Sequence, residues 1–442
     1  MWLSPAFSAL ANTAARVYYQ LTIAGERVPE TGPVLLVANH QNSLIDPMLV
    51  CAAARRPVRF LAKAPLFSDP KVGWLVRAMG SIPIYRRQDD PALVRRNLDT
   101  FREVYGVLAG GAAVGIFPEG RSHSEPSLAD LRTGAARIVV GTWSAHRLRV
   151  PIVPVGLVFR QKDLFRSDAL VVVGARLPLE DLGIGEVPDA QAVRGITERI
   201  GAALRQITLN LHTWEDRPLV ESAVDIWDAE WQADRDPVGR VQRLEVTTRL
   251  LADLRRQPDP RWTGLVRDVR AHARGLSRLG LVPASLGART DAATGVRWTV
   301  RRFHLLLPLA VALVVGGAVC FFPPYHLTGL IVRRLHLHED ERSTWKLLLG
   351  IVIYAVWIIA LAGAAAIRWG LAAGAVVAVS LPWVGVGGIV VRERWRGAWS
   401  DARRFFLLRS RRDLVAGLRA RQRDLAERFR ALYEERMAEA AT

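Results

Sequence analysis

The chain's first third holds a histidine and a carboxylate at a spacing that could support proton transfer. Residues 39–47 (NHQNSLIDP) follow a short apolar run. A neutral imidazole can take a proton from a hydroxyl near neutral pH, and a carboxylate on its other ring nitrogen sets the tautomer that does so. We predict that His40 is a general base and that Asp46 orients it. Asp46, directly before Pro47, also fits the N-cap of a helix, and a carboxylate has enough acceptor sites for both roles.

A second motif, residues 117–123 (FPEGRSH), also follows an apolar run. A guanidinium matches a phosphate with two parallel hydrogen bonds, and a glycine lets the backbone approach closely. Gly120 and Arg121 therefore indicate a phosphate-binding loop, in which Glu119 would bind the acceptor or hold the arginine. A surface turn would explain the same residue types.

Two further segments accompany these motifs. Residues 80–87 (GSIPIYRR) place Arg86 and Arg87 at the end of an apolar run, where they would bind an anion or be a solvated strand end. Residues 150–156 (VPIVPVG) read as a strand with two prolines and a structural role.

The elements around these motifs alternate between strand-like and helix-like stretches. The expected strands lie at 33–38, 58–62, 82–85, 113–117, 151–159 and 170–174, and the expected helices between them at 48–55, 71–79, 93–109 and 132–144. This alternation predicts an α/β domain with a covered mixed sheet, in which His40 follows a strand and precedes a helix.

Four blocks in this order resemble the PlsC-type family of glycerol-phosphate and lysophosphatidate acyltransferases. His40 with Asp46 matches its His–Asp block, and the segments at 80–86, 117–121 and 150–155 match its other three; the resemblance covers roughly residues 20–175. Five residues separate His40 from Asp46, one more than is usual, and Arg121 directly follows Gly120. Both variants resemble a branch with NHxNxxxDP and FPEGRSHS, related to glycerol-3-phosphate and dihydroxyacetone-phosphate acyltransferases.

The resemblance implies acyl transfer without a covalent acyl-enzyme. His40 would deprotonate a hydroxyl of glycerol-3-phosphate or lysophosphatidate, which attacks the thioester of acyl-CoA or acyl carrier protein. Arg121 with Gly120, Arg86 and Lys63 would bind the phosphate, and Glu119 would help to position the acceptor. No cofactor or metal is implied beyond the acyl-donor co-substrate.

Composition points to a membrane partner. Lys and Arg number 60 against 42 Asp and Glu, a formal charge of +18, which suits nucleic acid or an anionic membrane surface. Apolar segments of membrane length favour the membrane, and the arginines are too dispersed for a nucleic-acid-reading module. The two cysteines allow no disulfide framework or zinc spacing, and the start does not read as a signal peptide.

The expected domain organisation follows from these patterns. We predict an α/β acyltransferase domain, a soluble helical extension without a site, and C-terminal transmembrane helices. The boundaries are an N-terminal interfacial helix at 1–20, the acyltransferase domain at 21–188, the extension at 189–295, the membrane region at 303–391 and a basic helical tail at 392–442. The tail is expected to lie on a surface or a membrane.

Basic clusters flank the apolar segments, and the positive-inside tendency assigns all of them to the cytoplasm, with the catalytic domain. Three full crossings cannot satisfy that assignment. We therefore predict that 303–332 dips in and returns, bending near 316–317 or 323–324, while 347–367 and 371–391 form a helical hairpin. One straight crossing at 303–323 is the alternative.

Other functions stay open at this point. Within the same class, the chain could be a phospholipid–lysophospholipid transacylase or could use another acceptor. From a different class, it could be a non-catalytic membrane protein that binds anionic lipid. A serine hydrolase is disfavoured because no Gly-x-Ser-x-Gly elbow occurs.

Overall fold

The computed structural model describes residues 4–86, 91–180, 190–231, 236–257, 259–287 and 307–441. The chain divides into two compact units, which are described in turn. The first consists of Met1–Leu211, Asp236–Glu245 and Leu337–Leu347, and the second of His212–Arg235, Val246–His336 and Leu348–Thr442.

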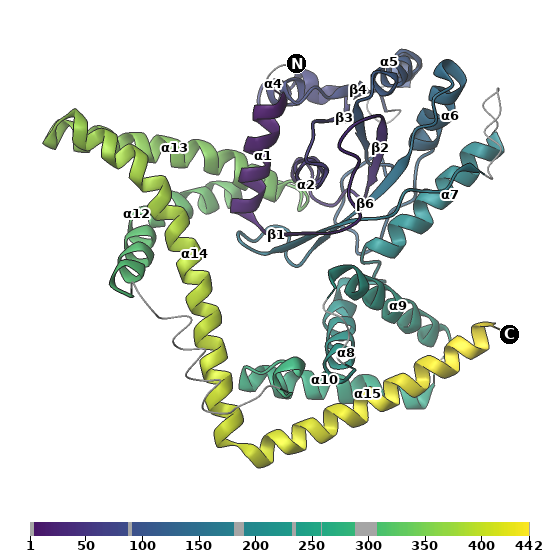
Figure 1. Ribbon diagram of the computed structural model, residues 1–442, viewed down its shortest axis with the longest axis vertical. Coiled ribbons are helices and arrows are strands. Elements are labelled where there is room, and N and C mark those ends of the chain that lie inside the picture. Colours follow the sequence, from purple (N-terminus) through teal and green to yellow (C-terminus); the bar gives the residue numbers. More distant parts are fainter. Residues whose placement is uncertain are drawn as a thin grey trace. The chain divides into compact units, whose positions relative to one another are not determined.

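The first unit is built on one mixed sheet, as the alternating pattern predicts (Figure 1). Its seven strands lie in the order β1 (Gln20–Gly25), β7 (Asp168–Val173), β6 (Ile152–Phe159), β2 (Val34–Ala38), β5 (Ala113–Ile116), β3 (Val58–Lys63) and β4 (Ile82–Ile84). Only the β6–β7 pair is antiparallel. Strand β1 was not predicted, because its half-polar sequence carries no apolar run.

Helices cover both faces of this sheet. Alternate residues of β2 point to opposite faces, so Leu36 and Ala38 share a core with α1 (Ser4–Tyr18) and α2 (Ile45–Ala54). Leu35 and Val37 share the other core with α5 (Asn97–Ala109), α6 (Gly134–His146) and α7 (Ala190–Ile207). Shorter helices complete the unit: α3 (Pro65–Ser68), α4 (Gly73–Ala78) and η1 (Pro91–Arg96).

The expected boundary at residue 188 leaves α7 outside the acyltransferase domain. In the structure, α7 contributes Ile196, Ile200 and Leu204 to the core on that sheet face. Its apolar stripe is therefore part of the sheet's packing.

The parallel strands bring the predicted motifs to one edge of the sheet. In the pairing register, Val37 of β2 lies beside Ile116 of β5, Gly115 of β5 beside Phe60 of β3, and Lys63 of β3 beside Ile84 of β4. The carboxyl ends of these strands therefore share an edge, which is where open α/β sheets place their ligand sites.

The second unit contains a helical group and a set of long apolar helices. The helical group consists of η3 (Trp214–Asp216), α8 (Arg217–Glu230), the end of α9 (Pro237–Arg256), α10 (Pro260–Leu279), η4 (Pro283–Ser285) and α15 (Arg412–Ala441). The C-terminal tail is a helix, as expected, and most of its described residues are exposed. Its apolar residues Leu425, Phe429 and Leu432 are buried, since α15 packs against α8 and α10.

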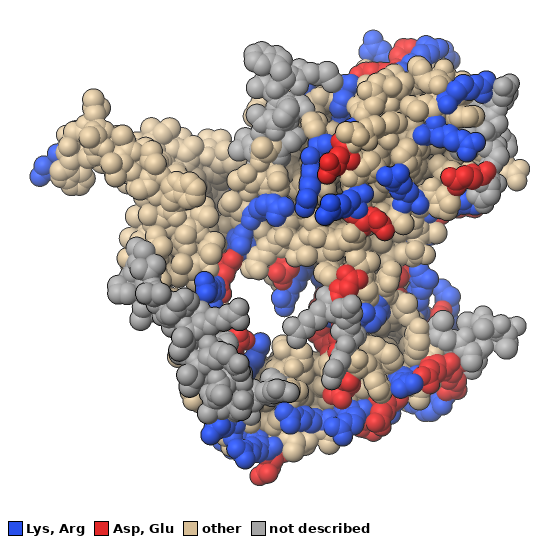
Figure 2. Space-filling view, viewed as in Figure 1, with Lys and Arg blue, Asp and Glu red and all other residues tan. Residues whose placement is uncertain are grey.

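In the part of the chain that the structure describes, three helices are long and apolar enough to cross a membrane: α12 (Leu307–Arg334), α13 (Arg342–Trp369) and α14 (Leu371–Ser410). On the face shown in Figure 2, the arm formed by α13 and the first part of α14 is covered almost entirely by uncharged residues. Helix α14 continues through the arginine-rich sequence to Ser410, well beyond the apolar segment that ends at residue 391.

Helix α12 carries Pro323 and Pro324 in its interior, and Figure 1 shows its two halves running in different directions. A proline lacks the N–H that would bond the carbonyl four residues earlier, so Pro324 leaves the Cys320 carbonyl without its helical partner. The indole N–H of Trp357 on α13 donates to that carbonyl at 2.9 Å. The expected bend therefore falls within a continuous helix rather than a broken segment, and α13 satisfies the freed backbone group. The first part of the predicted segment, 303–306, lies outside the described residues.

Candidate active site

His40 and Asp46 meet as predicted. The Nδ1 atom of His40 lies 2.9 Å from Oδ2 of Asp46, whose side chain is fully buried, whereas the His40 side chain is 18% exposed. The imidazole stacks on Phe117 with ring centroids 4.0 Å apart. With its Nδ1–H donated to the carboxylate, the ring keeps Nε2 as its acceptor.

Asp46 is not the N-cap that the sequence indicates. Helix α2 begins one residue earlier, at Ile45, and has no side-chain cap. Oδ2 of Asp46 instead accepts from the backbone N–H of Asn42 at 2.7 Å as well as from His40. The carboxylate therefore links the two ends of the loop between His40 and α2.

Two asparagines fasten this loop to the rest of the unit. The Asn39 amide makes a double hydrogen bond with the backbone of Leu157 on β6, at 3.0 and 2.7 Å. The Asn42 amide donates to the Tyr19 hydroxyl at 2.8 Å. Burial raises the pKa of Tyr19 far above its ordinary value, so this hydroxyl stays protonated and donates to the Lys162 carbonyl.

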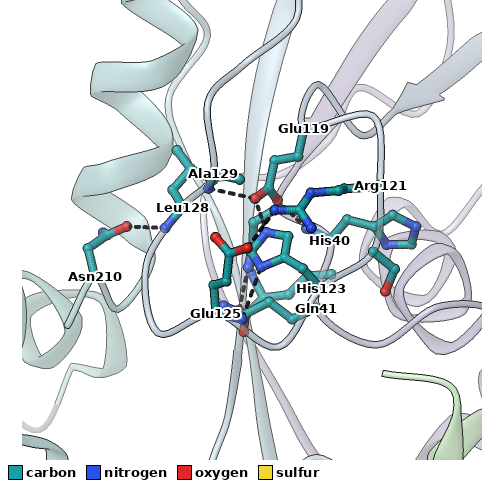
Figure 3. A network of polar contacts seen from close by, with 12 residues as sticks. His40, Gln41, Glu119, Arg121, His123, Glu125, Leu128, Ala129 and Asn210 are labelled. Carbon is teal, nitrogen blue, oxygen red and sulfur yellow. Dashed lines mark hydrogen bonds and ion pairs between the residues drawn. The ribbon is translucent and has the colours of Figure 1, made fainter. Parts of the chain in front are cut away.

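Glu119 ties the second motif to the first, as Figure 3 shows. Its Oε1 accepts from the backbone N–H of His40 at 2.6 Å. Its Oε2 accepts from the Ala129 N–H at 2.8 Å and is bonded to Nε2 of His123. Since the Glu119 side chain has no exposed surface, this geometry gives it the role of positioning His40. Its predicted contact with the acceptor stays a prediction.

Gly120 and Arg121 occupy the turn that follows. Gly120 has φ +73°, in the left-handed region that favours glycine. Arg121 is half exposed and pairs with Glu125, which is also half exposed. Such a pair contributes only about 0–1 kcal/mol, so the guanidinium can exchange its carboxylate for a phosphate.

Arg86 and Lys63 lie at the same edge of the sheet. The Arg86 guanidinium donates to the Gly120 carbonyl at 3.1 Å, which joins the second and third motifs. Lys63 is the last residue of β3 and is half-buried. Their binding of substrate stays a prediction, and Arg87 lies outside the described residues.

Lys162 was not among the predicted site residues. It follows β6, and its ammonium donates to the Gln41 carbonyl at 3.0 Å and to the Ser124 hydroxyl at 2.5 Å. Burial lowers its pKa, an effect that several nearby carboxylates, Asp340 and Asp46 first among them, oppose. It therefore bridges the two motifs that carry the predicted chemistry.

The first turn of α13 also touches the loop that carries His40 and Asp46. The Leu44 N–H donates to the Thr344 hydroxyl at 3.2 Å, and the Ser343 hydroxyl donates to the Lys162 carbonyl at 2.6 Å. Ser343 is fully buried, and Leu347 belongs to the core beneath α2. A segment some 300 residues downstream is thus part of the wall around His40, and no local sequence signal could have shown it.

Among the described residues, no group of three or more His, Cys, Asp or Glu side chains is arranged to hold a metal ion. The site offers instead an oriented imidazole beside a turn with an available guanidinium. That arrangement can take a proton from a hydroxyl of a phosphate-bearing molecule.

Comparison with known proteins shows which proteins this chain resembles. Residues 20–158 match the family model described as Acyltransferase. The chain is 25% identical over 276 residues to glycerol-3-phosphate O-acyltransferase 2 of Saccharomyces cerevisiae, covering 58% of this chain and 36% of the relative. It is 30% identical over 149 residues to a chloroplastic 1-acyl-sn-glycerol-3-phosphate acyltransferase of Brassica napus, covering 33% and 40%.

The chain thus spans less than half of the length of either curated relative. Among solved structures, the acyltransferase PlsC of Thermotoga maritima is similar with 18% identity and a TM-score of 0.34, covering 44% of this chain and 76% of that one.

Proposed function

We propose that this chain, whose residues 20–158 form an acyltransferase-family domain, is a glycerolipid O-acyltransferase of phospholipid synthesis. It transfers a fatty acyl group from acyl-CoA or acyl carrier protein to a hydroxyl of glycerol-3-phosphate or lysophosphatidate. The observation that carries the proposal is the contact of 2.9 Å between His40 and the buried Asp46 within that domain. The activities of the yeast and Brassica napus relatives support the choice of acceptor class.

The His40–Asp46 pair supports a single-displacement mechanism. Nε2 of His40 takes the proton of the acceptor hydroxyl while its oxygen attacks the thioester carbonyl carbon. The tetrahedral intermediate then collapses, the C–S bond breaks, and the leaving thiolate takes the proton from the imidazolium. Asp46 holds the ring in the required tautomer and stabilises its charged form.

The acceptor's phosphate would bind at the turn after β5. Arg121 is exposed and held only by an exposed partner, and Arg86 braces the same turn through the Gly120 carbonyl. The predicted contribution of Lys63 to this anion site rests on its place at the end of β3.

The protein's location is proposed to be a membrane, with the catalytic domain on the cytoplasmic side. Three long apolar helices support membrane association. Residues Leu337–Leu347, the end of the connector after α12 and the first turns of α13, belong to the same compact unit as the loop that carries His40. The C-terminal end of α12 leads directly into this segment, which is in keeping with a dip by α12 and a crossing hairpin by α13 and α14.

The test offers glycerol-3-phosphate, dihydroxyacetone phosphate and lysophosphatidate side by side to the purified full-length protein with one long-chain acyl-CoA, and repeats the set with acyl carrier protein. Acyl transfer to a phosphate-bearing acceptor supports the proposal. Transfer only from a phospholipid to a lysophospholipid would make the protein a transacylase. Lipid binding without any transfer would make it a non-catalytic anionic-lipid-binding protein and contradict the proposal.

A further inference from the structure

A second feature lies in the other compact unit and has no part in the chemistry above. Helix α14 leaves its apolar segment at residue 391 and continues unbroken into a sequence rich in arginine and tryptophan. The apolar segment 371–391 is about 30 Å long at 1.5 Å per residue, close to the thickness of a bilayer's hydrocarbon core. If α14 spans the bilayer, the residues that immediately follow, Arg392–Arg396, lie at the depth of the lipid headgroups.

A cavity of about 550 Å³ opens at this point. Helix α14 supplies one continuous stripe of its lining at helical spacing, and α12 and the end of α10 supply the rest. The lining residues are Gly280, Val314, Arg392, Trp395, Arg396, Trp399, Ser400 and Arg403. The stripe thus aims three guanidinium groups and two indoles at one space.

The walls of this cavity are firmly packed. On one side, the Arg404 guanidinium donates to the Gly280 carbonyl at 3.1 Å and lies 3.6 Å from the Asp401 carboxylate. On the other side, α12 and α14 meet through glycines: a Cβ added at Gly388 would lie 2.6 Å from the Leu313 carbonyl oxygen. Val314 and Arg392 lie within one turn of that contact.

The three lining arginines differ from Arg404. Arg392, Arg396 and Arg403 are exposed, and within the described part of the chain none of them has a hydrogen bond or an ion pair. Glu393 and Asp401 are the acidic residues on this stretch of α14; Asp401 pairs with Arg404, and Glu393 has an interaction of its own. Counted over the described residues, the cavity therefore carries more positive than negative charge.

We propose that this cavity binds the phosphate headgroup of an anionic phospholipid of the surrounding membrane. Guanidinium groups bind phosphate oxygens in pairs, and tryptophan is enriched at the level of the headgroups. The apolar surface beside the cavity fits the acyl chains of the same lipid: Val315, next to the lining residue Val314, is 54% exposed. A free phosphate ion would use the arginines but not this apolar surface.

Arg394 provides a matched control for the arginines of the cavity. It is exposed and carries the same charge at the same depth as Arg396, but it lies two residues away on the opposite face of α14 and does not line the cavity. Diffuse attraction between the protein and anionic lipid would be reduced equally by loss of either charge. If the cavity is a specific lipid site, lipid affinity falls on loss of Arg396 and not on loss of Arg394.

The experiment titrates the full-length protein in detergent with dioleoylphosphatidylglycerol or dioleoylphosphatidylcholine and counts the bound lipids by native mass spectrometry. Wild type and Arg394→Gln should bind phosphatidylglycerol alike and in preference to phosphatidylcholine. Arg396→Gln should bind it roughly 10-fold more weakly, as expected for loss of one charge-assisted contact. Gel filtration of each variant establishes that it is folded.

Three results would overturn the proposal. An equal loss of phosphatidylglycerol affinity in both variants would assign the binding to diffuse charge. An unchanged affinity in Arg396→Gln would show that the cavity is not the binding site. Displacement of phosphatidylglycerol by millimolar inorganic phosphate would assign the site to a free anion rather than a lipid. None of these outcomes depends on acyltransferase activity.

Discussion

The contact between Thr344 and the backbone of Leu44 allows a sharp test of how the catalytic loop is held. Thr344 is 6% exposed, and its hydroxyl accepts from the Leu44 N–H at 3.2 Å, two residues before Asp46. Thr344→Val keeps the shape of the side chain and removes the acceptor. The Leu44 N–H then loses its partner beside the loop that carries His40.

The size of the effect follows from the cost of an unsatisfied donor, about 1–3 kcal/mol. Because Leu44 is only partly buried, we expect the lower part of that range. Since about 1.4 kcal/mol corresponds to a factor of ten in rate, kcat should fall roughly 5- to 10-fold. The acceptor KM should change little, because Arg121 lies on a different loop.

The assay is steady-state acyl transfer by the full-length protein, with Thr344→Ser as the matched control. The serine variant keeps the hydroxyl and should retain kcat close to that of wild type. Equal kcat in the valine variant and wild type would show that the start of α13 does not position the loop. A loss of the same size in both variants would refute the hydrogen bond as the cause.

Four further outcomes are expected. Arg121→Lys keeps the charge but loses the fork, so the acceptor KM should rise about 10-fold without a change in the acyl-donor KM; an unchanged acceptor KM would remove Arg121 from the site. Gly120→Ala should lower the thermal midpoint and the activity, because a side chain at φ +73° costs about 1–2 kcal/mol; a variant as stable as wild type would contradict this. Glu339 is exposed, so it can be replaced by a cysteine in a protein whose native cysteines are removed. This cysteine should not react with a membrane-impermeant thiol reagent in intact cells, and its labelling from outside would contradict the dip of α12. Burial lowers the pKa of His272 below its ordinary 6.5, so at low pH the unfolded chain binds more protons at this residue than the folded one. The thermal midpoint followed by helix circular dichroism should therefore fall as pH drops below 6.5, and His272→Leu should lose this pH dependence. An equal pH dependence in both proteins would refute the reasoning.

Much of the sheet could be predicted because its inner strands are short apolar runs between turn residues. The motif residues then follow from topology, since the loops after β2 and β5 leave adjacent parallel strands at the same edge. The edge strand β1 escaped prediction because it is half-exposed and lacks such a run. The role of Asp46 in a local loop rather than a helix cap depends on the left-handed residue Ser43, which the sequence does not mark.

The parts that could not be predicted depend on contacts distant in sequence. Lys162 and Thr344 have ordinary local surroundings, and only the folded chain brings them to residues 41 and 44. Glu119 was expected to bind the acceptor or to hold Arg121, which lies two residues further along the same loop. Its burial against His123, four residues on, could have been suspected from the spacing, but the bond to the His40 backbone could not.

The measurement that tests the central claim most directly is acyl transfer by His40→Ala, with His146→Ala, at an exposed position in the last turn of α6, as the control. A positioned proton acceptor is worth about 10²–10⁴-fold in rate, so turnover by His40→Ala should fall at least about 100-fold while His146→Ala stays near wild type. Turnover by a folded His40→Ala protein at a rate close to that of wild type would contradict the account.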